Sequence, residues 1–171
     1  TFTYLFLTIM RDIRDNYMAN IWNELGYAEN YQVFARTETI SSVLILILLS
    51  LMVFIRNNMR ALRIAHIIIA AGLFIAGLSS LLFLSGMLSG YLWMLFVGFG
   101  LYLGYILFNC IFFERLIASF RVNGNAGFVI YFADAFGYLG SVMVMLSKEF
   151  SRTELEWSSL YSYGVIFSSF L

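Results

Sequence analysis

Proline is absent from this chain, and cysteine and histidine each occur once in its 171 residues. The lone Cys110 excludes a disulfide within these residues and a metal cluster built on cysteines. His66 has no second histidine, cysteine or carboxylate beside it at metal-ligand spacing. We therefore expect no metal site and no cofactor.

Without proline, helix irregularity is expected to come from glycine. Glycines gather in two of the hydrophobic stretches, at Gly98, Gly100, Gly104, Gly137 and Gly140. Such residues let neighbouring helix backbones approach closely, or they let a helix bend as a hinge. Both interpretations stay open on the sequence alone.

Charge is also scarce, because only 12% of the residues are charged and the ten basic side chains cancel the ten acidic ones. Ordinary soluble domains are about 25% charged and about 45–50% apolar, whereas this chain is 61% hydrophobic. A balanced charge gives no reason to expect nucleic-acid binding. No serine–histidine–aspartate pattern, phosphate-binding glycine loop or metalloprotease motif occurs, so we predict no enzyme activity. The expected environment is the lipid bilayer.

The apolar residues come in long blocks, and residues 64–113 contain no charged side chain at all. Because a membrane-spanning helix needs about 20 apolar residues, this block predicts two helices joined at the turn "SGMLSG". The whole chain is predicted to be one all-α domain, residues 1–171, folded as a polytopic transmembrane six-helix bundle. The predicted spans are about 1–22, 39–55, 64–84, 91–113, 126–146 and 157–171.

The chain begins without methionine or a basic leader, and its last predicted span is short, so we expect a fragment of a longer protein. Basic residues between the spans indicate the orientation. Five fall on one side of the membrane, Arg56, Arg60, Arg63, Arg115 and Arg121, and three on the other, Arg36, Lys148 and Arg152. Since basic loops stay inside, the first side and both ends of the chain are predicted to be cytoplasmic.

The first predicted span carries four charges, on Arg11, Asp12, Arg14 and Asp15. At 100° per residue they occupy an arc of about 160° on one side of a helix. Ionisable groups inside a membrane usually face the bundle interior or a water-filled cavity. The four charges either neutralise one another and hold the helix in register, or form the wall of a cavity in which an arginine binds a polar or anionic solute.

Asp134 lies near the centre of the fifth predicted span, with no basic residue within one helical turn. An intramembrane carboxyl group is by default a candidate for function. Three roles are open: a structural hydrogen bond, an ion pair with Arg11 or Arg14 across the bundle, or a proton carrier.

The fourth predicted span carries Tyr102, Tyr105 and Asn109 at spacings of three and four, which places them on one face. Such a polar stripe either lines a cavity or joins helices by hydrogen bonds. Glu114 and Arg115 follow at the predicted cytoplasmic mouth of this span. They form either a gate or an interfacial pair whose heads reach toward water.

Six spans with short loops and both ends inside resemble one half, the C-terminal half, of a major facilitator superfamily transporter. The charged first span resembles helix seven of that family, which lines the central cavity. "FIRNNMRALR" lies where the family has a basic cytoplasmic loop, but Asn57 and Asn58 depart from its glycine–aspartate–arginine signature. "FNCIFFERLIASFR" and "YFADAFGYLGS" resemble an uncharacterised bacterial branch of the superfamily.

This resemblance implies one half of a twelve-helix fold in a bacterial inner membrane, with a missing N-terminal six-helix half of the same chain as its partner. It implies secondary active transport of a small polar or anionic solute, with proton coupling as one mode. Arg11 or Arg14 would orient the solute, Asp134 would carry the proton, and the first and fourth spans would be repeat partners that line the cavity. The alternative is a membrane receptor or scaffold that kept the fold but does not transport.

Overall fold

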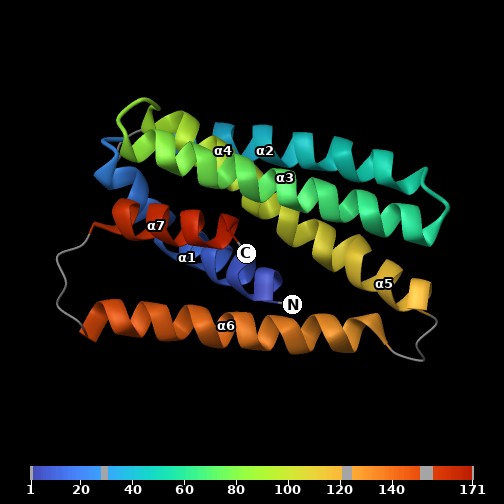
Figure 1. The fold of residues 1–171 in the computed structure, drawn as a ribbon. Helices are drawn as coiled ribbons and strands as arrows, with labels where there is room; N and C mark the ends of the chain where they lie inside the picture. Colours follow the sequence, from blue (N-terminus) through green and yellow to red (C-terminus); the bar gives the residue numbers. More distant parts are fainter. Residues whose placement is uncertain (1, 28–30, 121–124, 151–155, 171) are drawn as a thin grey trace.

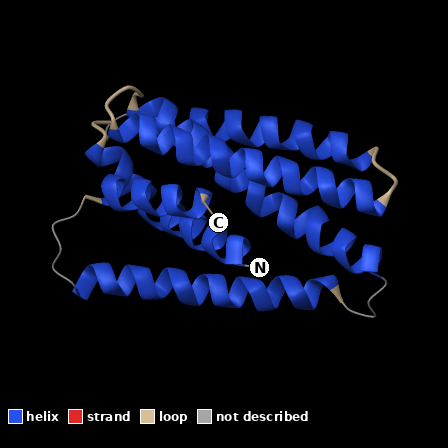
Figure 2. Cartoon of the chain, viewed as in Figure 1, coloured by secondary structure: helices blue, strands red, loops and turns tan. Residues whose placement is uncertain are grey.

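The computed structural model describes residues 2–27, 31–120, 125–150 and 156–170, and all regular structure within them is helical (Figures 1 and 2). The helices are α1 (Phe2–Glu24), α2 (Tyr31–Val53), α3 (Asn58–Leu84), α4 (Gly90–Leu107), the π-helix η1 (Phe108–Phe112), α5 (Phe113–Phe120), α6 (Ala126–Phe150) and α7 (Trp157–Ser169). Because α4, η1 and α5 follow one another without a break, they form one long rod, and the described chain contains six rods. The predicted all-α fold is confirmed.

By length and composition, four of these helices are long and apolar enough to cross a membrane, as expected of a membrane-embedded protein. The other two helices do not meet both conditions: α1 is long enough but carries four charges near its middle, and α7 has only 13 residues. The six predicted helices are therefore present, and four of them qualify as spans by length and composition. These four are Gln32–Val53, Asn58–Leu84, Gly90–Phe120 and Ala126–Lys148.

Several predicted boundaries are wrong, because charged residues were taken to end a helix. The second helix begins at Tyr31 and the third at Asn58, each six to eight residues earlier than predicted. Arg36 and Glu38 consequently lie on α2 rather than in a loop. The fourth rod continues to Phe120, so the segment after residue 113 is helical as well. Residues 121, 152 and 171, which entered the orientation and span predictions, lie outside the described residues.

Local signals set the ends of the two central helices. At the start of α3 the Asn57 side chain accepts a hydrogen bond from the Arg60 amide at 3.1 Å, and Ser89 caps α4 in the same way through Leu92. Such caps satisfy amides that have no partner within the helix. Between the two helices Gly86 has φ +74°, in the left-handed region that favours glycine. The predicted turn at "SGMLSG" is confirmed.

The helix packing has an internal twofold pattern. The main packed pairs are α1 with α4, α6 and α7, α3 with α4 and α7, and α2 with α4. Exchanging α1 with α4, α2 with α6 and α3 with α7 turns this set of pairs into itself. The first three helices therefore pack as the last three do. In Figure 1, α2 and α6 lie at opposite edges of the bundle.

The core is centred on α1, where Tyr4, Leu7, Ile13 and Trp22 are at most 1% exposed. Ile9 and Ile13, on the side of α1 opposite its charges, are buried as well, at 5% and 1% exposed, so both sides of α1 meet packed helices. The outer helices α2 and α6 instead carry apolar side chains that stay more than half exposed, as expected of surfaces that face lipid. They include Leu46, Ile47, Leu51 and Val53 on α2 and Phe128, Phe132, Leu139 and Met143 on α6.

The glycines mark close contacts between helices. A Cβ atom at Gly100 would collide with the backbone oxygen of Gly72 on α3, and one at Gly137 would lie 2.5 Å from Thr8 Cγ2. The helix irregularities occur elsewhere, at Tyr17 in α1 (φ −114°, ψ 16°) and in the π turn of Phe108–Phe112. The prediction that bends come from glycine is therefore wrong for these two places.

Candidate functional site

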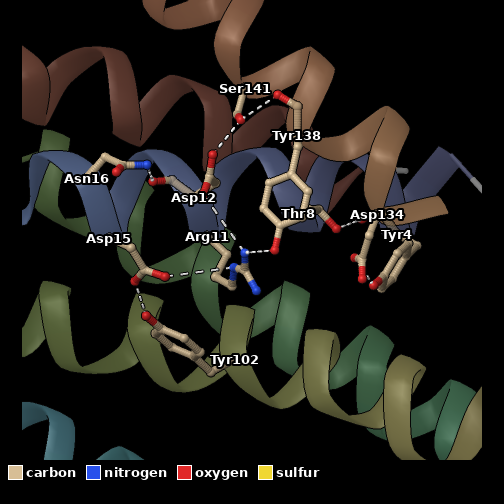
Figure 3. A network of polar contacts seen from close by, with 10 residues as sticks. All are labelled: Tyr4, Thr8, Arg11, Asp12, Asp15, Asn16, Tyr102, Asp134, Tyr138 and Ser141. Atoms are coloured by element: carbon tan, nitrogen blue, oxygen red, sulfur yellow. Dashed lines mark hydrogen bonds and ion pairs between the residues drawn. The ribbon is translucent and has the colours of Figure 1, made fainter. Parts of the chain in front are cut away.

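A chain of polar contacts runs along α1 and connects it to α4 and α6 (Figure 3). It also connects α1 to η1, through Tyr4 and Asn109. The rungs between α1 and the fourth rod pair Asp15 with Tyr102, Arg11 with Tyr105, and Tyr4 with Asn109. The order is reversed between the two rods because they run in opposite directions. The predicted stripe of Tyr102, Tyr105 and Asn109 therefore faces the charged helix over its whole length. We call these three rungs the polar ladder.

Arg11 lies at the middle of the polar ladder, and its side chain is 12% exposed. Its Cζ atom is 4.1 Å from the centre of the Tyr105 ring, a cation–π distance, and Nη2 donates to the Tyr138 hydroxyl at 3.2 Å. The contacts with carboxylates are longer, at 3.9 Å to Asp12 and 3.8 Å to Asp15. Arg11 is thus held chiefly by aromatic side chains, with carboxylates close by.

Arg14 is placed differently, because its side chain is completely buried. Nη2 lies 2.6 Å from Glu38 Oε1 on α2, and the guanidinium group occupies the space beside Gly98 that a Cβ atom would fill. Among the described residues, its Nε and Nη1 atoms have no hydrogen-bond partner. Mutual neutralisation of the four charges of α1, one of the two alternatives left open by the sequence, therefore does not hold for Arg14, which pairs with Glu38 of α2.

The two aspartates of α1 bind hydroxyl groups of other helices. Tyr102 of α4 donates to Asp15, and Ser141 of α6 donates to Asp12 (Figure 3). Asn16 also donates to the main-chain oxygen of Asp12 at 2.9 Å. The four charges of α1 therefore do more than neutralise one another, because they fasten α1 to three neighbouring helices.

Asp134 of α6 meets the other end of the polar ladder. The Tyr4 hydroxyl donates to Asp134 and accepts a hydrogen bond from Asn109 Nδ2 at 2.9 Å. Tyr4 is fully buried, and its ring stacks on that of Tyr105. The hydrogen-bond partner of Asp134 among the described residues is thus a tyrosine, and neither Arg11 nor Arg14 forms an ion pair with it there. Asn109 sits in the π turn, a local irregularity that is frequent at functional sites.

Glu114 and Arg115 lie apart from the polar ladder, in α5. Arg115 Nη1 donates to Asn58 Oδ1 at 2.6 Å, at the first residue of α3, and Glu114 is exposed. The structure thus joins Arg115 to α3 and leaves the gate role a prediction.

A second polar cluster fastens the break in α1 to α7. The ring of Tyr17 stacks on Trp157 with 3.6 Å between ring centres, and Lys148 Nζ lies 3.5 Å from the centre of the Trp157 ring. The Glu24 carboxylate accepts from the amides of Trp157 and Ser158 at 2.8 and 2.7 Å. An acidic group at this place satisfies the free amides at the start of α7.

Sequence reasoning missed Tyr4, Glu38, Tyr138 and Ser141. Tyr4 precedes Arg11 by seven residues and Asp15 by eleven, so helical periodicity places it on the same face. Tyr138 and Ser141 follow Asp134 by four and seven residues in the same way. Helical periodicity could not identify Glu38, because its segment was predicted to be a loop.

Comparison with known proteins gives one family. Residues 1–171 match the profile of a family of unknown function, DUF5690. The chain belongs to this family. No curated protein and no solved structure matches the chain. For this DUF5690 member, the polar ladder and its surroundings are therefore the basis for an argument about function.

Proposed function

We propose that the chain is one half of a proton-coupled secondary transporter for small polar solutes in a bacterial inner membrane. The observation that carries this proposal is the polar ladder inside an apolar bundle. Placing Arg11, Arg14, Asp12 and Asp134 inside an apolar helical bundle is costly, and such groups in membranes usually serve a substrate or proton path. A fold that needed only stability would be served by apolar side chains at these positions.

The internal twofold pattern supports the proposal. Transporters of several folds consist of inverted repeats, with broken helices at corresponding positions around the binding site. Here α1 and the fourth rod are counterparts under the exchange of helices, and both are interrupted, α1 at Tyr17 and the rod at Phe108–Phe112. The same pattern supports the resemblance to half of a major facilitator transporter, which remains part of this proposal. A second six-helix unit of the same protein would complete the cavity.

The contacts suggest separate roles for the proton and the solute. Asp134 would take up the proton. Because the Tyr4 hydroxyl contacts both Asp134 and Asn109, a change in the protonation of Asp134 would alter the hydrogen bond between Tyr4 and Asn109. Arg11, held by the rings of Tyr105 and Tyr138, would orient the solute. Because both arginines already lie near carboxylates, a polar solute fits better than an anionic one.

Proton movement by the full-length protein in liposomes tests this function. The liposomes would contain a pH-sensitive dye and receive, one at a time, amino acids, sugars, small carboxylates and small amines. At least one class is expected to move protons with the wild-type protein and none with Asp134→Asn. Glu156→Gln is the matched control, because Glu156 is exposed outside the bundle and its side chain makes no capping bond to α7. Equal proton movement by Asp134→Asn and the wild type would contradict the proton role.

The alternative is a receptor or scaffold that keeps the fold without transport. One observation favours it: Arg14 is fully buried and tied to Glu38, as in a purely structural ion pair. Under this alternative no solute class moves protons or accumulates in the liposomes, while the protein remains folded.

A further inference from the structure

A pocket of about 380 Å³ lies between α2 and α4, beside the ion pair of Arg14 and Glu38. Its size falls in the range of small-molecule sites, about 300–1,000 Å³. The side chains that decide its chemistry are Glu38, Ser41, Ile45 and Leu49 from α2 and Tyr102 and Ile106 from α4.

The pocket has one polar and one apolar end. Along α2, Glu38 and Ser41 come first, and Ile45 and Leu49 follow on the same face at helical spacing. On α4, Tyr102 comes one turn before Ile106. Because α2 and α4 run in the same direction (Figure 1), the polar residues of both helices share one end. The pocket therefore suits an amphipathic molecule whose head and tail have a fixed orientation.

At the polar end of the pocket, the Ser41 hydroxyl group lacks a hydrogen-bond partner. Its residue is 3% exposed, and its Oγ atom has no hydrogen bond to any described residue. A buried hydroxyl group without a partner is unfavourable, so a bound group that donates to it or accepts from it would stabilise this end. Glu38, in contrast, keeps a third of its side chain exposed beside the same pocket.

The charge at the polar end favours a cation. Glu38 lines the pocket, and Asp15 is bound to the Tyr102 hydroxyl at its edge, while Arg14 supplies one positive charge behind Glu38. Two carboxylates against one guanidinium leave one negative charge. Arg11 lies 3.8 Å from Asp15 and 3.9 Å from Asp12, and counting Arg11 and Asp12 as well gives three carboxylates against two guanidinium groups, again one negative charge. An ammonium group has three donors and no acceptor, which matches Glu38 and Ser41 as acceptors.

We propose that this pocket binds a small amphipathic molecule with a primary ammonium head, placed at Glu38 and Ser41, and an apolar body among Ile45, Leu49 and Ile106. The pocket adjoins the polar ladder at Tyr102 and is not lined by Arg11, so it is a binding site in addition to the one at Arg11. That the bound compound is a transported solute rests on the proposed transport function. Binding is nevertheless measurable without transport.

Three probes with the same apolar body and different heads test the proposal: phenethylammonium, 3-phenylpropionate and 2-phenylethanol. Calorimetric titration of the full-length protein in lipid nanodiscs is expected to give about tenfold tighter binding of phenethylammonium than of either other probe, since bonds between charged groups are the stronger ones. Equal or tighter binding of 3-phenylpropionate or 2-phenylethanol would overturn the assignment, as would no binding of phenethylammonium.

Variants connect the binding to this pocket. Ser41→Ala leaves the ion pair of Arg14 in place and is expected to weaken phenethylammonium binding about fivefold, the value of one hydrogen bond. Ser50→Ala is the matched control, because the Ser50 hydroxyl lies on the same helix and is bonded to Leu46 O. Ile106→Trp, which would fill the apolar end, is expected to abolish binding. Unchanged affinity in Ser41→Ala and Ile106→Trp would overturn the proposal.

Failure of this assignment and failure of transport are distinguishable. Binding of phenethylammonium without proton movement in liposomes would remove the transport function and keep the pocket. Proton movement driven by another solute, with no binding of phenethylammonium, would keep transport and remove the ammonium site.

Discussion

Arg14 Nη2 lies 2.6 Å from Glu38 Oε1, and this ion pair joins the centre of the bundle to its outer helix α2. The two residues are 24 positions apart, on different helices. Arg14 is completely buried, whereas Glu38 stays one-third exposed, so the pair is asymmetric. Removing the Glu38 carboxylate leaves the buried charge of Arg14 without its partner. Removing Arg14 leaves a Glu38 carboxylate that is still partly exposed at the surface of the chain.

This asymmetry predicts that Glu38→Gln destabilises the protein more than Arg14→Met does. Losing one partner of a buried pair costs about 3–5 kcal/mol, and the partial exposure of Glu38 places the expected loss at the lower end, about 3 kcal/mol. The double variant Arg14→Met with Glu38→Gln is expected to recover part of that loss, because no buried charge remains. Unfolding titrations in mixed micelles measure all three variants. A double variant less stable than Glu38→Gln would contradict this account.

The sequence could predict the helices but not all of their ends. Long uncharged runs and the Gly–Ser turn at residues 85–90 locate the apolar segments, because lipid requires helices there. Arg36 and Glu38 were taken to mark the end of a span, but a helix can continue where the bilayer ends. The backbone of residues 31–38 is helical even though the segment contains the charged side chains of Arg36 and Glu38.

The sequence could also select the polar face of α1 but not its partners. Helical periodicity places Arg11, Asp12, Arg14 and Asp15 on one side, and the structure brings all four into contacts with other helices. Which side chains they meet depends on how distant helices pack, and Tyr4 meets Asp134 across 130 positions of sequence. A single sequence carries no signal for pairs so far apart.

We expect the contact of Glu24 with the start of α7 to contribute measurably to the free energy of unfolding. Its carboxylate accepts from two amides at the first turn of that helix, and loss of such a cap costs about 0.5–2 kcal/mol. Glu24→Gln keeps one acceptor oxygen and loses the charge, so we expect it to cost about 1 kcal/mol in the same titration. Glu156→Gln, at the N-cap position of α7 but without a capping bond, should leave stability unchanged. Equal effects of the two variants would show that the contact of Glu24 does not stabilise α7.

Two glycines one turn apart on α4 are expected to respond differently to alanine. A Cβ atom at Gly100 would collide with the backbone oxygen of Gly72, which cannot move without shifting α3. A Cβ atom at Gly104 would lie 3.1 Å from Leu7 Cδ1, the end of a side chain that can shift slightly. We expect Gly100→Ala to cost about 3 kcal/mol or more and Gly104→Ala under about 1 kcal/mol. Thermal unfolding of the two variants side by side checks the difference, and a reversed order would refute the close contact of α3 and α4.

The predicted orientation can be measured at the two ends of α3. Phe54 and Met87 are both strongly exposed, at 81% and 74%, and flank α3 on opposite sides. In a chain with Cys110→Ser, a cysteine at Met87 should react with a membrane-impermeant maleimide added outside intact cells. A cysteine at Phe54 should react only after the membrane is permeabilised, because the basic segment beside it is predicted to be cytoplasmic. The opposite labelling pattern would reverse the orientation.

Tyr4 connects the proton candidate to the π turn through one hydroxyl group, and Tyr4→Phe removes only that group. The ring contacts with Tyr105 and Phe108 remain available to phenylalanine. Because Asp134 and Asn109 both lose a buried partner, we expect a loss of about 1–3 kcal/mol in unfolding free energy. Tyr163→Phe, at a tyrosine that is 62% exposed, is the matched control and should change little.

A double-mutant cycle separates the Tyr4 contact from general damage to the core. If the hydroxyl acts through Asp134, the losses caused by Tyr4→Phe and Asp134→Asn are not additive, with a coupling of about 0.5–3 kcal/mol. Tyr4→Phe combined with Glu24→Gln should be additive, because Glu24 binds the start of α7 and shares no partner with Tyr4. Additive losses in both pairs would mean that Tyr4 stabilises the bundle only by packing, and the link from Asp134 through Tyr4 to Asn109 would lose its basis.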